Sequence, residues 1–317
     1  MRPLILAPSV AAPADSLAVD GDPIGAAAYL SHWPGTPEPL PQFAADTATG
    51  MTVRAAATGW LAQFPVVCNN HLDADGVLAM LVCCRPELAS SHGQLLEAAA
   101  EAGDFTAWLG PRPQRLLLAV HQLLRTYAGQ DQAAIMAVIA GADELLAAAD
   151  QADPERDAQI SQIERAILIA PEQIRLDHKR LAVIRWTRRI GHAWDGFGQV
   201  YQPDDLPLAA IAACVPQERF QLLVEDTAHG PVVVCAAPGH SWARTVSRPR
   251  IAWPDCTALA AELQRSEQGP GRWVAGAPAR KVGFTTILAT VDADFLPVAT
   301  SHDPAVVQAL IRSALAT

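Results

Sequence analysis

Five polar side chains that could bind a metal or move a proton lie within residues 69–75. They are Asn69, Asn70, His71, Asp73 and Asp75. Burying two carboxylates and an imidazole without partners is costly, so a hydrophobic core gains nothing from them. A divalent cation would satisfy all three, because carboxylate and imidazole groups are ordinary ligands of Mn²⁺ and Mg²⁺. We therefore expect His71, Asp73 and Asp75 to be metal ligands and catalytic residues, with Asn69 and Asn70 contacting the substrate.

The segments on either side of this cluster predict where it lies in the fold. An apolar run at 64–68 precedes it and is typical of a buried strand. Gly76 and the apolar run 77–82 follow it and are compatible with a helix. The cluster is thus expected at the carboxyl end of a strand, which is where open α/β sheets bind their ligands.

Five residues outside the cluster are further candidates. Asp104 directly follows a predicted helix, 86–103, and is a candidate metal ligand. Asp46 stands before another predicted helix, where it could be a ligand or only an N-cap. His32, before a tryptophan, could contact the substrate or simply pack on that ring. His240 and Arg244 could bind a phosphate, or belong to an ordinary exposed strand at 241–246.

The motif His71-x-Asp73-x-Asp75-Gly76 resembles the first motif of the DHH phosphoesterase superfamily. Members include single-strand exonucleases, cyclic-dinucleotide phosphodiesterases and manganese pyrophosphatases. The resemblance implies a two-metal site in which Asp73 and Asp75 bind Mn²⁺ or Mg²⁺, and a metal-activated water that attacks a phosphate ester or anhydride. It also implies that Asp104 could serve as the carboxylate of the second motif. The His-His pair that gives the superfamily its name does not occur in this chain.

Other interpretations of the same residues remain open. The run from Leu72 to Leu78 also resembles the nucleophile loop of haloacid-dehalogenase-like phosphatases, which implies Asp73 as nucleophile and Asp75 as general acid. The chain could instead be a non-catalytic ligand-binding protein on a degenerate DHH-like scaffold. The loop could also merely cap a helix, although capping requires only one aspartate. Over most of its length the chain is similar to an uncharacterised bacterial family, in phrases such as Leu30-Ser-His-Trp-Pro-Gly35 and Ala102-Gly-Asp-Phe105.

Composition limits the partners that we expect. The net charge of −10 over 317 residues argues against extended nucleic-acid binding. The resemblance to phosphoesterases implies instead a small phosphorylated or nucleotide-like substrate. No apolar run reaches the roughly 18 residues of a membrane span, so we expect no membrane partner. The six cysteines form no CxxC pair and most lie inside apolar runs, which favours small core residues of a cytoplasmic protein.

The expected fold class is α/β: a parallel-sheet domain with a helical middle segment and a smaller α+β C-terminal part. We place the α/β domain with the metal-site loop at 1–110, the helical segment at 111–198 and the α+β domain that closes over the substrate at 199–317. Within this plan we predict helices at 24–33, which is rich in alanine, and at 154–188, which has helix-period apolar positions. Residues 191–205, rich in glycine and aromatic residues, are predicted to form a loop.

Overall fold

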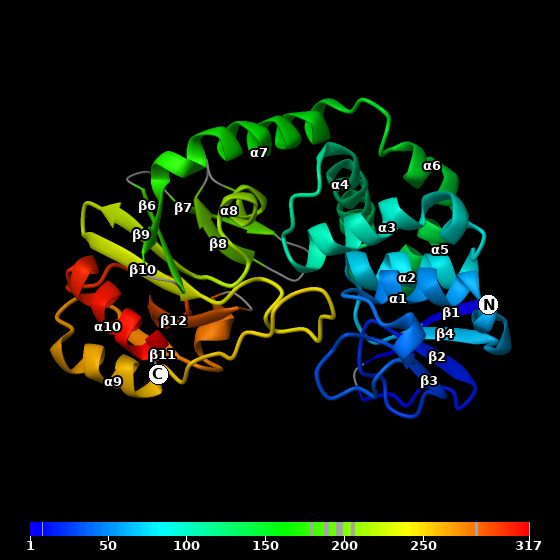
Figure 1. Cartoon of the computed structure of the whole chain (residues 1–317), viewed down its shortest axis with the longest axis horizontal. Coiled ribbons are helices and arrows are strands. Elements are labelled where there is room, and N and C mark those ends of the chain that lie inside the picture. Colours follow the sequence, from blue (N-terminus) through cyan, green and yellow to red (C-terminus); the bar gives the residue numbers. More distant parts are fainter. Residues whose placement is uncertain are drawn as a thin grey trace. The chain divides into compact units, whose positions relative to one another are not determined.

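A computed structural model describes residues 1–7, 9–177, 180–186, 190–194, 199–203, 207–282 and 285–316. The mixed α/β class that we predicted is confirmed (Figure 1). Contacts within the chain form two compact units. The first comprises residues 1–161 and 242–248, and the second comprises 162–241 and 249–317. This grouping differs from the three predicted domains, because the helices that follow residue 110 join the α/β domain.

The first unit contains a four-stranded, entirely parallel sheet in the order β1-β4-β2-β3. Its strands are β1 (Arg2–Ile5), β2 (Ser16–Val19), β3 (Ala28–Leu30) and β4 (Val66–Asn69). Successive side chains alternate between the two faces. Leu17 and Val19 therefore join the main core, whereas Ala18 joins a small cluster on the other face. Both faces are buried, as parallel sheets require.

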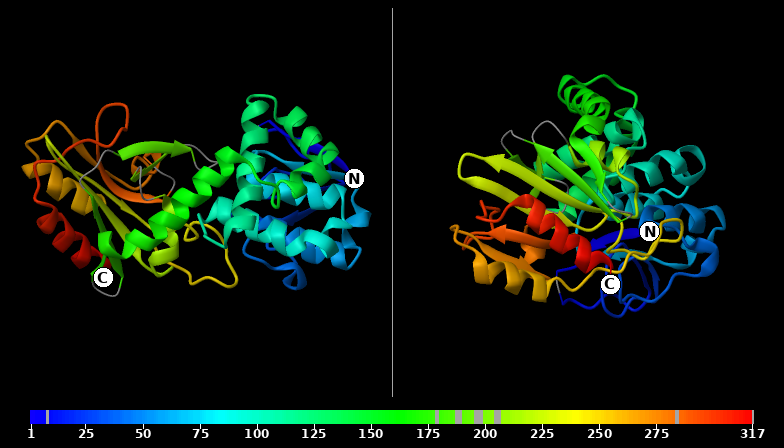
Figure 2. Two further views of the ribbon diagram at one scale, coloured as in Figure 1. Left: turned by 90° about the horizontal axis from the view of Figure 1, so that it is seen from above. Right: turned by 60° about the vertical axis from the view of Figure 1, so that its left-hand side comes forward.

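Helices cover the main face of this sheet in layers (Figures 1 and 2). The first unit contains α1 (Ala48–Ala57), α2 (Ala74–Cys84), α3 (Leu88–Asp104), α4 (Pro111–Thr126), α5 (Asp131–Ala140) and α6 (Ala142–Ala147), with 3₁₀ turns at Pro41–Phe43 and Trp60–Gln63. Helix α2 contacts strands β1, β2 and β4 of the sheet as well as helices α1, α3 and α5. Ten of its eleven residues are buried, which explains why its sequence is apolar apart from Asp75 in the first turn.

The second unit is built on a mixed six-stranded sheet in the order β11-β12-β10-β9-β6-β5, in which only β6 and β9 pair in parallel. Its strands are β5 (Ile174–Asp177), β6 (Leu181–Trp186), β9 (Phe220–Thr227), β10 (Gly230–Ala236), β11 (Arg272–Ala275) and β12 (Thr286–Val291), and β7 (Ile190–Trp194) pairs separately with β8 (Gln199–Pro203). The helices are α7 (Pro154–Gln173, shared with the first unit), α8 (Leu208–Cys214), α9 (Thr257–Ser266), α10 (Pro304–Ala316) and a 3₁₀ turn at Ala279–Lys281. Apolar residues of α9 and α10 share one core with this sheet.

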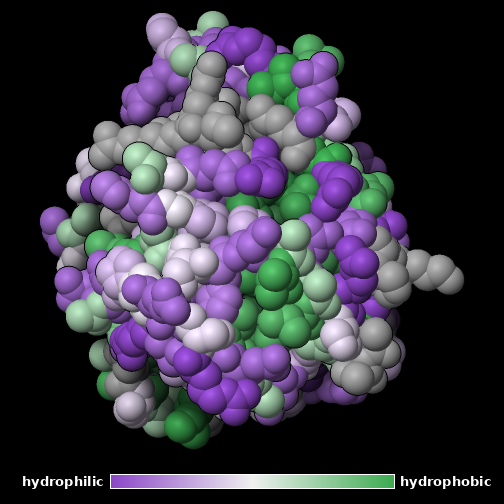
Figure 3. All heavy atoms as spheres, turned by 90° about the vertical axis from the view of Figure 1, so that its left-hand side faces the viewer, coloured by the Kyte–Doolittle hydropathy of each residue, from purple (hydrophilic) through white to green (hydrophobic). Residues whose placement is uncertain are grey.

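Exposed apolar residues are dispersed over the described part of the second unit, as in Leu176 and Val306. Figure 3 shows one face of the molecule, on which hydrophilic residues surround a limited hydrophobic patch. Patches of limited extent are common on folded proteins and need no partner to explain them. Among the described residues, no helix combines the length and the apolar character needed to cross a bilayer.

Four predicted elements differ from the structure. The helix at 24–33 is wrong: Ala28–Leu30 forms an edge strand, because pairing with β2 and burial of Leu30 outweigh the helix preference of this alanine-rich stretch. The helix at 154–188 ends at Gln173, and a strand pair follows it. Part of the predicted loop at 191–205 is the pair β7–β8, and residues 195–198 and 204–205 lie outside the described residues. The strand at 241–246 is an irregular segment instead.

Glu267 should dominate the acid stability of the second unit. Its Oε1 accepts hydrogen bonds from the Gly269 and Ser301 amides, and its Oε2 accepts from Trp273 Nε1 and the Thr300 hydroxyl. Burial opposes ionisation, but these donors, led by the Thr300 and Ser301 groups, lower the pKa of Glu267 to about 2. The stabilisation from the ionised Glu267 is therefore complete above about pH 4.5, which is the ordinary pKa of a glutamate side chain. It is lost as the pH falls toward the lowered pKa of about 2.

We expect Glu267→Ala to lower the free energy of unfolding at pH 7 by about 3 kcal/mol, because its hydrogen-bond donors, three of which are partly buried, lose a charged acceptor. The exposed Glu262 of α9 is the matched control, and its alanine variant should change stability by less than about 0.5 kcal/mol. Urea unfolding between pH 2 and pH 7 measures both. A Glu267→Ala protein with an unchanged midpoint at pH 7 would contradict this account.

Candidate metal centre

Polar residues from three neighbouring strands meet at one edge of the parallel sheet. Asp20 directly follows β2, His32 lies two residues after β3, and His71 lies two residues after β4. Because all strands of this sheet run in the same direction, their carboxyl ends share an edge, as expected for the binding edge of an α/β sheet. Asp75 in the first turn of α2 and Asp104 at the end of α3 come to the same place.

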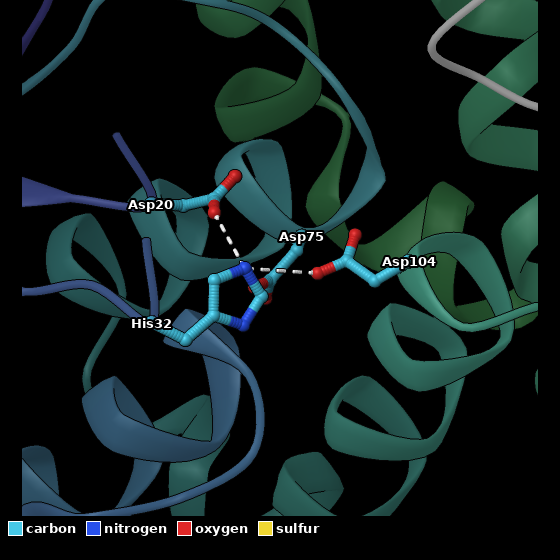
Figure 4. A group of neighbouring side chains, drawn as sticks. All are labelled: Asp20, His32, Asp75 and Asp104. Carbon is cyan, nitrogen blue, oxygen red and sulfur yellow. Dashed lines mark ion pairs between the residues drawn. The ribbon is translucent and has the colours of Figure 1, made fainter. Parts of the chain in front are cut away.

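Asp20, His32, Asp75 and Asp104 form the first group of possible ligands. All four are buried, and Figure 4 shows His32 directed between the carboxylates of Asp20 and Asp104. His32 Nε2 lies 3.3 Å from Asp20 Oδ1, 3.3 Å from Asp104 Oδ2 and 4.0 Å from Asp75 Oδ2. One ion could therefore bind one atom from each residue.

Asp20, His71 and Asp73 form a second group. His71 Nε2 lies 3.1 Å from Asp20 Oδ2 and 3.1 Å from Asp73 Oδ2. Asp20 thus belongs to both groups and presents one oxygen to each: Oδ1 faces His32, and Oδ2 faces His71. A carboxylate placed in this way can bridge two metal ions.

Both aspartates of the motif also bind helix N-termini. Asp73 is the N-cap of α2, since its Oδ1 accepts a 2.9 Å hydrogen bond from the Gly76 amide. Asp75 accepts 2.7 Å hydrogen bonds from the amides of Ala48 and Thr49, at the start of α1. Capping therefore explains one role of each aspartate, but it does not explain why two histidines and two more carboxylates gather around them.

The charges of the cluster perturb one another strongly. Burial disfavours ionisation of Asp20, yet attraction to His71 and His32 holds its pKa far below the ordinary range. Burial also opposes charge on His32, but Asp20 raises the pKa of this imidazole to about 8. Burial, followed by the charge of Asp20, raises the pKa of Asp75 to about 7. Burial and the neighbouring Asp75 raise the pKa of Asp104 well above its usual value. Metal binding to such a cluster would displace protons.

The donor set fits a divalent cation. Asp20 Oδ2, His32 Nε2 and both carboxylate oxygens of Asp104 are buried without a hydrogen-bond partner among the described residues. Buried polar atoms normally have partners, and atoms that lack one indicate an ion or water. Oxygen-rich sites with one or two imidazoles suit Mn²⁺ or Mg²⁺. The residues present could accordingly hold one ion in each group.

His32 is oriented for this role by the chain itself. Its Nδ1 lies 2.7 Å from the carbonyl oxygen of Asp46, which can only accept a hydrogen bond, so Nδ1 carries the proton. Nε2 is then the atom available to a metal, and such backbone partners commonly fix ligand histidines. The Asp46 carboxylate itself lies outside both groups, where it accepts hydrogen bonds from the amides of Val246 and Ser247.

The remaining predicted residues occupy different places. Asn69 ends β4, and its Oδ1 accepts hydrogen bonds from the amides of Asn70 and His71, which shapes the loop. Asn70 Nδ2 donates to the exposed Asp22. Arg244 belongs to the first unit and donates through Nη2 to Ser31 O and Thr36 Oγ1.

His240 belongs to the second unit, where its Nε2 lies 3.0 Å from Pro249 O. The structure thus brings His32, His71, Asp73, Asp75 and Asp104 together, whereas the carboxylate of Asp46 and the imidazole of His240 belong to neither ligand group. Substrate contacts of Asn69, Asn70 and Arg244 stay predictions.

Asp20 is the site residue that the sequence analysis missed. It belongs to the dipeptide Asp20-Gly21, which is typical of an ordinary turn. The available signal was its position directly after the apolar run 17–19, because a carboxylate that ends a parallel strand lies at the binding edge. The structure adds a second sign: Asp20 has φ of 43°, a left-handed conformation that is uncommon outside glycine and is often found at functional sites.

Gly76 should not tolerate even one added methyl group. A Cβ at this position would lie 2.3 Å from Asn69 Nδ2 and 3.0 Å from Asp20 Oδ2, both of which are buried. We expect Gly76→Ala to displace Asp20, to lower the free energy of unfolding by about 1–3 kcal/mol and to weaken metal binding. Gly59→Ala is a control for backbone effects alone. A Cβ added at Gly59 would meet no other atom within 4 Å, although the φ of 74° disfavours alanine. Gly76→Ala with the wild-type denaturation midpoint and metal affinity would contradict this packing account.

Comparisons with known proteins identify a family but no activity. The chain belongs to a family of unknown function, DUF6687, whose model matches residues 6–292. No curated protein matches it in sequence. Among solved structures it is similar to the pGpG-specific phosphodiesterase PggH from Vibrio cholerae, with 13% identity and a TM-score of 0.40 over 95% of this chain and 83% of that one. A TM-score this low does not establish a common fold, so the function is inferred from the side chains alone.

Proposed function

We propose that this protein is a metal-dependent phosphoric ester hydrolase of the DHH type that uses two Mn²⁺ or Mg²⁺ ions. One observation carries the proposal: the two groups of buried ligands share Asp20, which presents a different oxygen to each. An isolated structural cluster has no need for such sharing. Two ions held close together are the arrangement that many phosphoryl-transfer enzymes use, and Asp20 would hold both.

When bound, two such ions would activate a water molecule and clamp a phosphoryl group. The chain's own residues hold the site in position. Trp33 Nε1 donates a 3.1 Å hydrogen bond to Asp20 Oδ1, and the Asp46 carbonyl orients His32. The Asp73 and Asp75 carboxylates are fixed by helix N-termini, so their rotamers are set before any ligand arrives.

The proposed substrate is a small phosphorylated or nucleotide-like molecule. A net charge of −10 leaves little general attraction for a long polyanion, whereas a metal pair can still bind a single phosphate group. The proposed location is the cytoplasm, in keeping with six cysteines that remain free thiols.

The haloacid-dehalogenase-like alternative makes Asp73 a covalent nucleophile. Such a nucleophile must reach a phosphorus atom, but Asp73 Oδ1 already accepts from the Gly76 amide and Oδ2 lies against His71. Asp73 is also only 3% exposed. These contacts favour a ligand role. Trifluoroberyllate bonded to Asp73 in a crystal structure would instead support the alternative.

Turnover assays test the proposal and separate it from a non-catalytic binding protein. Chromogenic phosphomonoesters and phosphodiesters, inorganic pyrophosphate and short linear and cyclic dinucleotides should be assayed with Mn²⁺, with Mg²⁺ and after chelation. We expect hydrolysis of at least one class that depends on metal and is lost in His71→Ala. Tight nucleotide binding without turnover under every condition would support the binding protein, and absence of metal binding would overturn the metal-dependent hydrolase.

A further inference from the structure

Seven residues from the C-terminal half of the chain complete the surroundings of the candidate metal centre. We call Trp242–Arg248 the strap. Its neighbours in sequence, Ser241 and Pro249, belong to the second unit, yet the strap itself belongs to the first. It has no helix or strand, so its conformation depends on contacts with other segments.

The first set of contacts holds the segment that carries His32. The amide of Arg244 donates a 2.8 Å hydrogen bond to the carbonyl of His32, and its guanidinium donates a 3.1 Å bond to Ser31 O. Trp242 packs edge-on against the His32 ring, with the ring centroids 5.0 Å apart. The strap therefore touches both the backbone and the side chain of this ligand.

The second set passes through Asp46. Its carboxylate accepts a 2.6 Å hydrogen bond from Val246 N, a 2.9 Å bond from Ser247 N and a further bond from the Ser247 hydroxyl. The carbonyl of the same residue accepts the His32 Nδ1 proton. Any movement of the strap would thus be transmitted through Asp46 to the orientation of His32 Nε2.

The third set holds the end of α3, which carries Asp104. Arg248 lies 3.4 Å from Asp46 Oδ2 and pairs with Glu101, and its guanidinium is 4.8 Å from the centroid of the Phe105 ring. Its side chain is 8% exposed, so both ion pairs are shielded from water. Glu101 and Phe105 lie on either side of Asp104 in sequence, so these contacts hold the backbone that carries Asp104.

In the other group, His71 and Asp73 are held by hydrogen bonds of their own loop, while Asp20 is common to both groups. The strap approaches His71 through Trp33, whose ring packs on both Trp242 and His71. The His71 amide donates a 3.2 Å hydrogen bond to Asn69 Oδ1, and Asp73 accepts from Gly76. The His71 side chain is also 23% exposed, in contrast to the complete burial of His32. The two groups therefore differ both in burial and in what positions them.

We infer that the strap is a positioning element for one of two metal subsites. It sets the metal affinity of the Asp20–His32–Asp75–Asp104 subsite and leaves that of the Asp20–His71–Asp73 subsite unchanged. Arg248 and Ser247 are positioning residues in this scheme, because they touch Asp46, Glu101 and Phe105 and no reacting group. The inference rests on the proposed function, since it requires that the chain bind metal.

Isolated subsites give the sharpest test. Arg248→Ala is introduced separately into His71→Ala, which retains the buried subsite, and into His32→Ala, which retains the more exposed one. Mn²⁺ affinity is measured from the electron paramagnetic resonance signal of the free ion. We expect the dissociation constant to rise about 10- to 100-fold in the His71→Ala background, as for other residues that orient ligands, and to stay unchanged in the His32→Ala background.

Arg54→Ala is the matched control. Arg54 also joins α1 to α3 through an ion pair, 3.1 Å from Glu97, but it belongs to neither ligand group and lies outside the strap. It should change Mn²⁺ affinity in neither background. Ser247→Ala is a milder variant that removes only one hydroxyl from Asp46, and it should weaken the buried subsite by about 10-fold.

The possible outcomes distinguish failure of this inference from failure of the proposed hydrolase function. Equal weakening in both backgrounds would show that the strap only stabilises the unit, and it would overturn the inference. Unchanged affinity in both backgrounds, for Arg248→Ala and Ser247→Ala alike, would also overturn it while leaving the proposed hydrolase intact. A wild-type protein that binds no Mn²⁺ would remove the proposed function itself.

Discussion

Asp20→Asn is expected to abolish binding of both metal ions and to reduce hydrolytic activity at least about 100-fold. The reason is geometric, because each oxygen of Asp20 lies within 3.3 Å of the Nε2 of one histidine. Asparagine keeps the shape of the side chain but removes its charge and offers only one oxygen. Stabilisation of charge by metals is worth several kcal/mol, and each 1.4 kcal/mol corresponds to a factor of ten.

Asp22→Asn is the matched control for this variant. Asp22 is exposed, lies two residues away and bonds only to Asn70 among the described residues. We expect it to retain metal binding and activity within about threefold, as surface substitutions usually do. Isothermal titration with Mn²⁺ measures the number of ions bound by each protein. Two ions bound by Asp20→Asn with wild-type affinity would exclude a bridging role for Asp20.

Mn²⁺ is expected to stabilise the first unit strongly against heat. An ion that binds only the folded state contributes about 2.7 kcal/mol when its concentration is 100 times its dissociation constant. For a unit of this size, that gain corresponds to a rise in Tm of about 5–10 °C. Repulsion among the clustered carboxylates in the metal-free protein adds to the effect, since a cation neutralises them.

Differential scanning calorimetry with Mn²⁺ and with a chelator measures this shift. The variant with both Asp73→Asn and Asp75→Asn should lose most of it, because each ligand group then lacks a carboxylate. If this double variant shows the same shift as the wild type, the ions bind elsewhere. If millimolar Mn²⁺ leaves the wild-type Tm unchanged, the candidate metal centre is not a metal site.

Local sequence patterns predicted those candidate site residues that lie close together in the chain. His71, Asp73 and Asp75 lie between an apolar strand and an apolar helix, and this order alone places them at the sheet edge. Asp104 and His32 were recognisable as candidates. The role that we propose for His32 as a ligand was not foreseen, because its contact with Asp104 joins residues that are 72 positions apart.

Long-range pairing accounts for what the sequence did not show. The strap reads as a strand because Trp242 and Val246 favour extended backbone, yet Arg244 and Ser247 bind residues about 200 positions earlier. Nothing in its local pattern indicates that Asp46 is its partner. The edge strand β3 was missed for the same reason, since its pairing with β2 decides its conformation.

A crystal structure of the protein soaked with Mn²⁺, with anomalous diffraction recorded above the manganese edge, tests the central claim most directly. We predict two anomalous peaks roughly 3.5–4 Å apart, the usual separation in two-metal sites. Asp20 should bridge them, with His32 and Asp104 on one ion and His71 and Asp73 on the other. Peaks that lie away from Asp20, or no peak at this sheet edge, would contradict the claim.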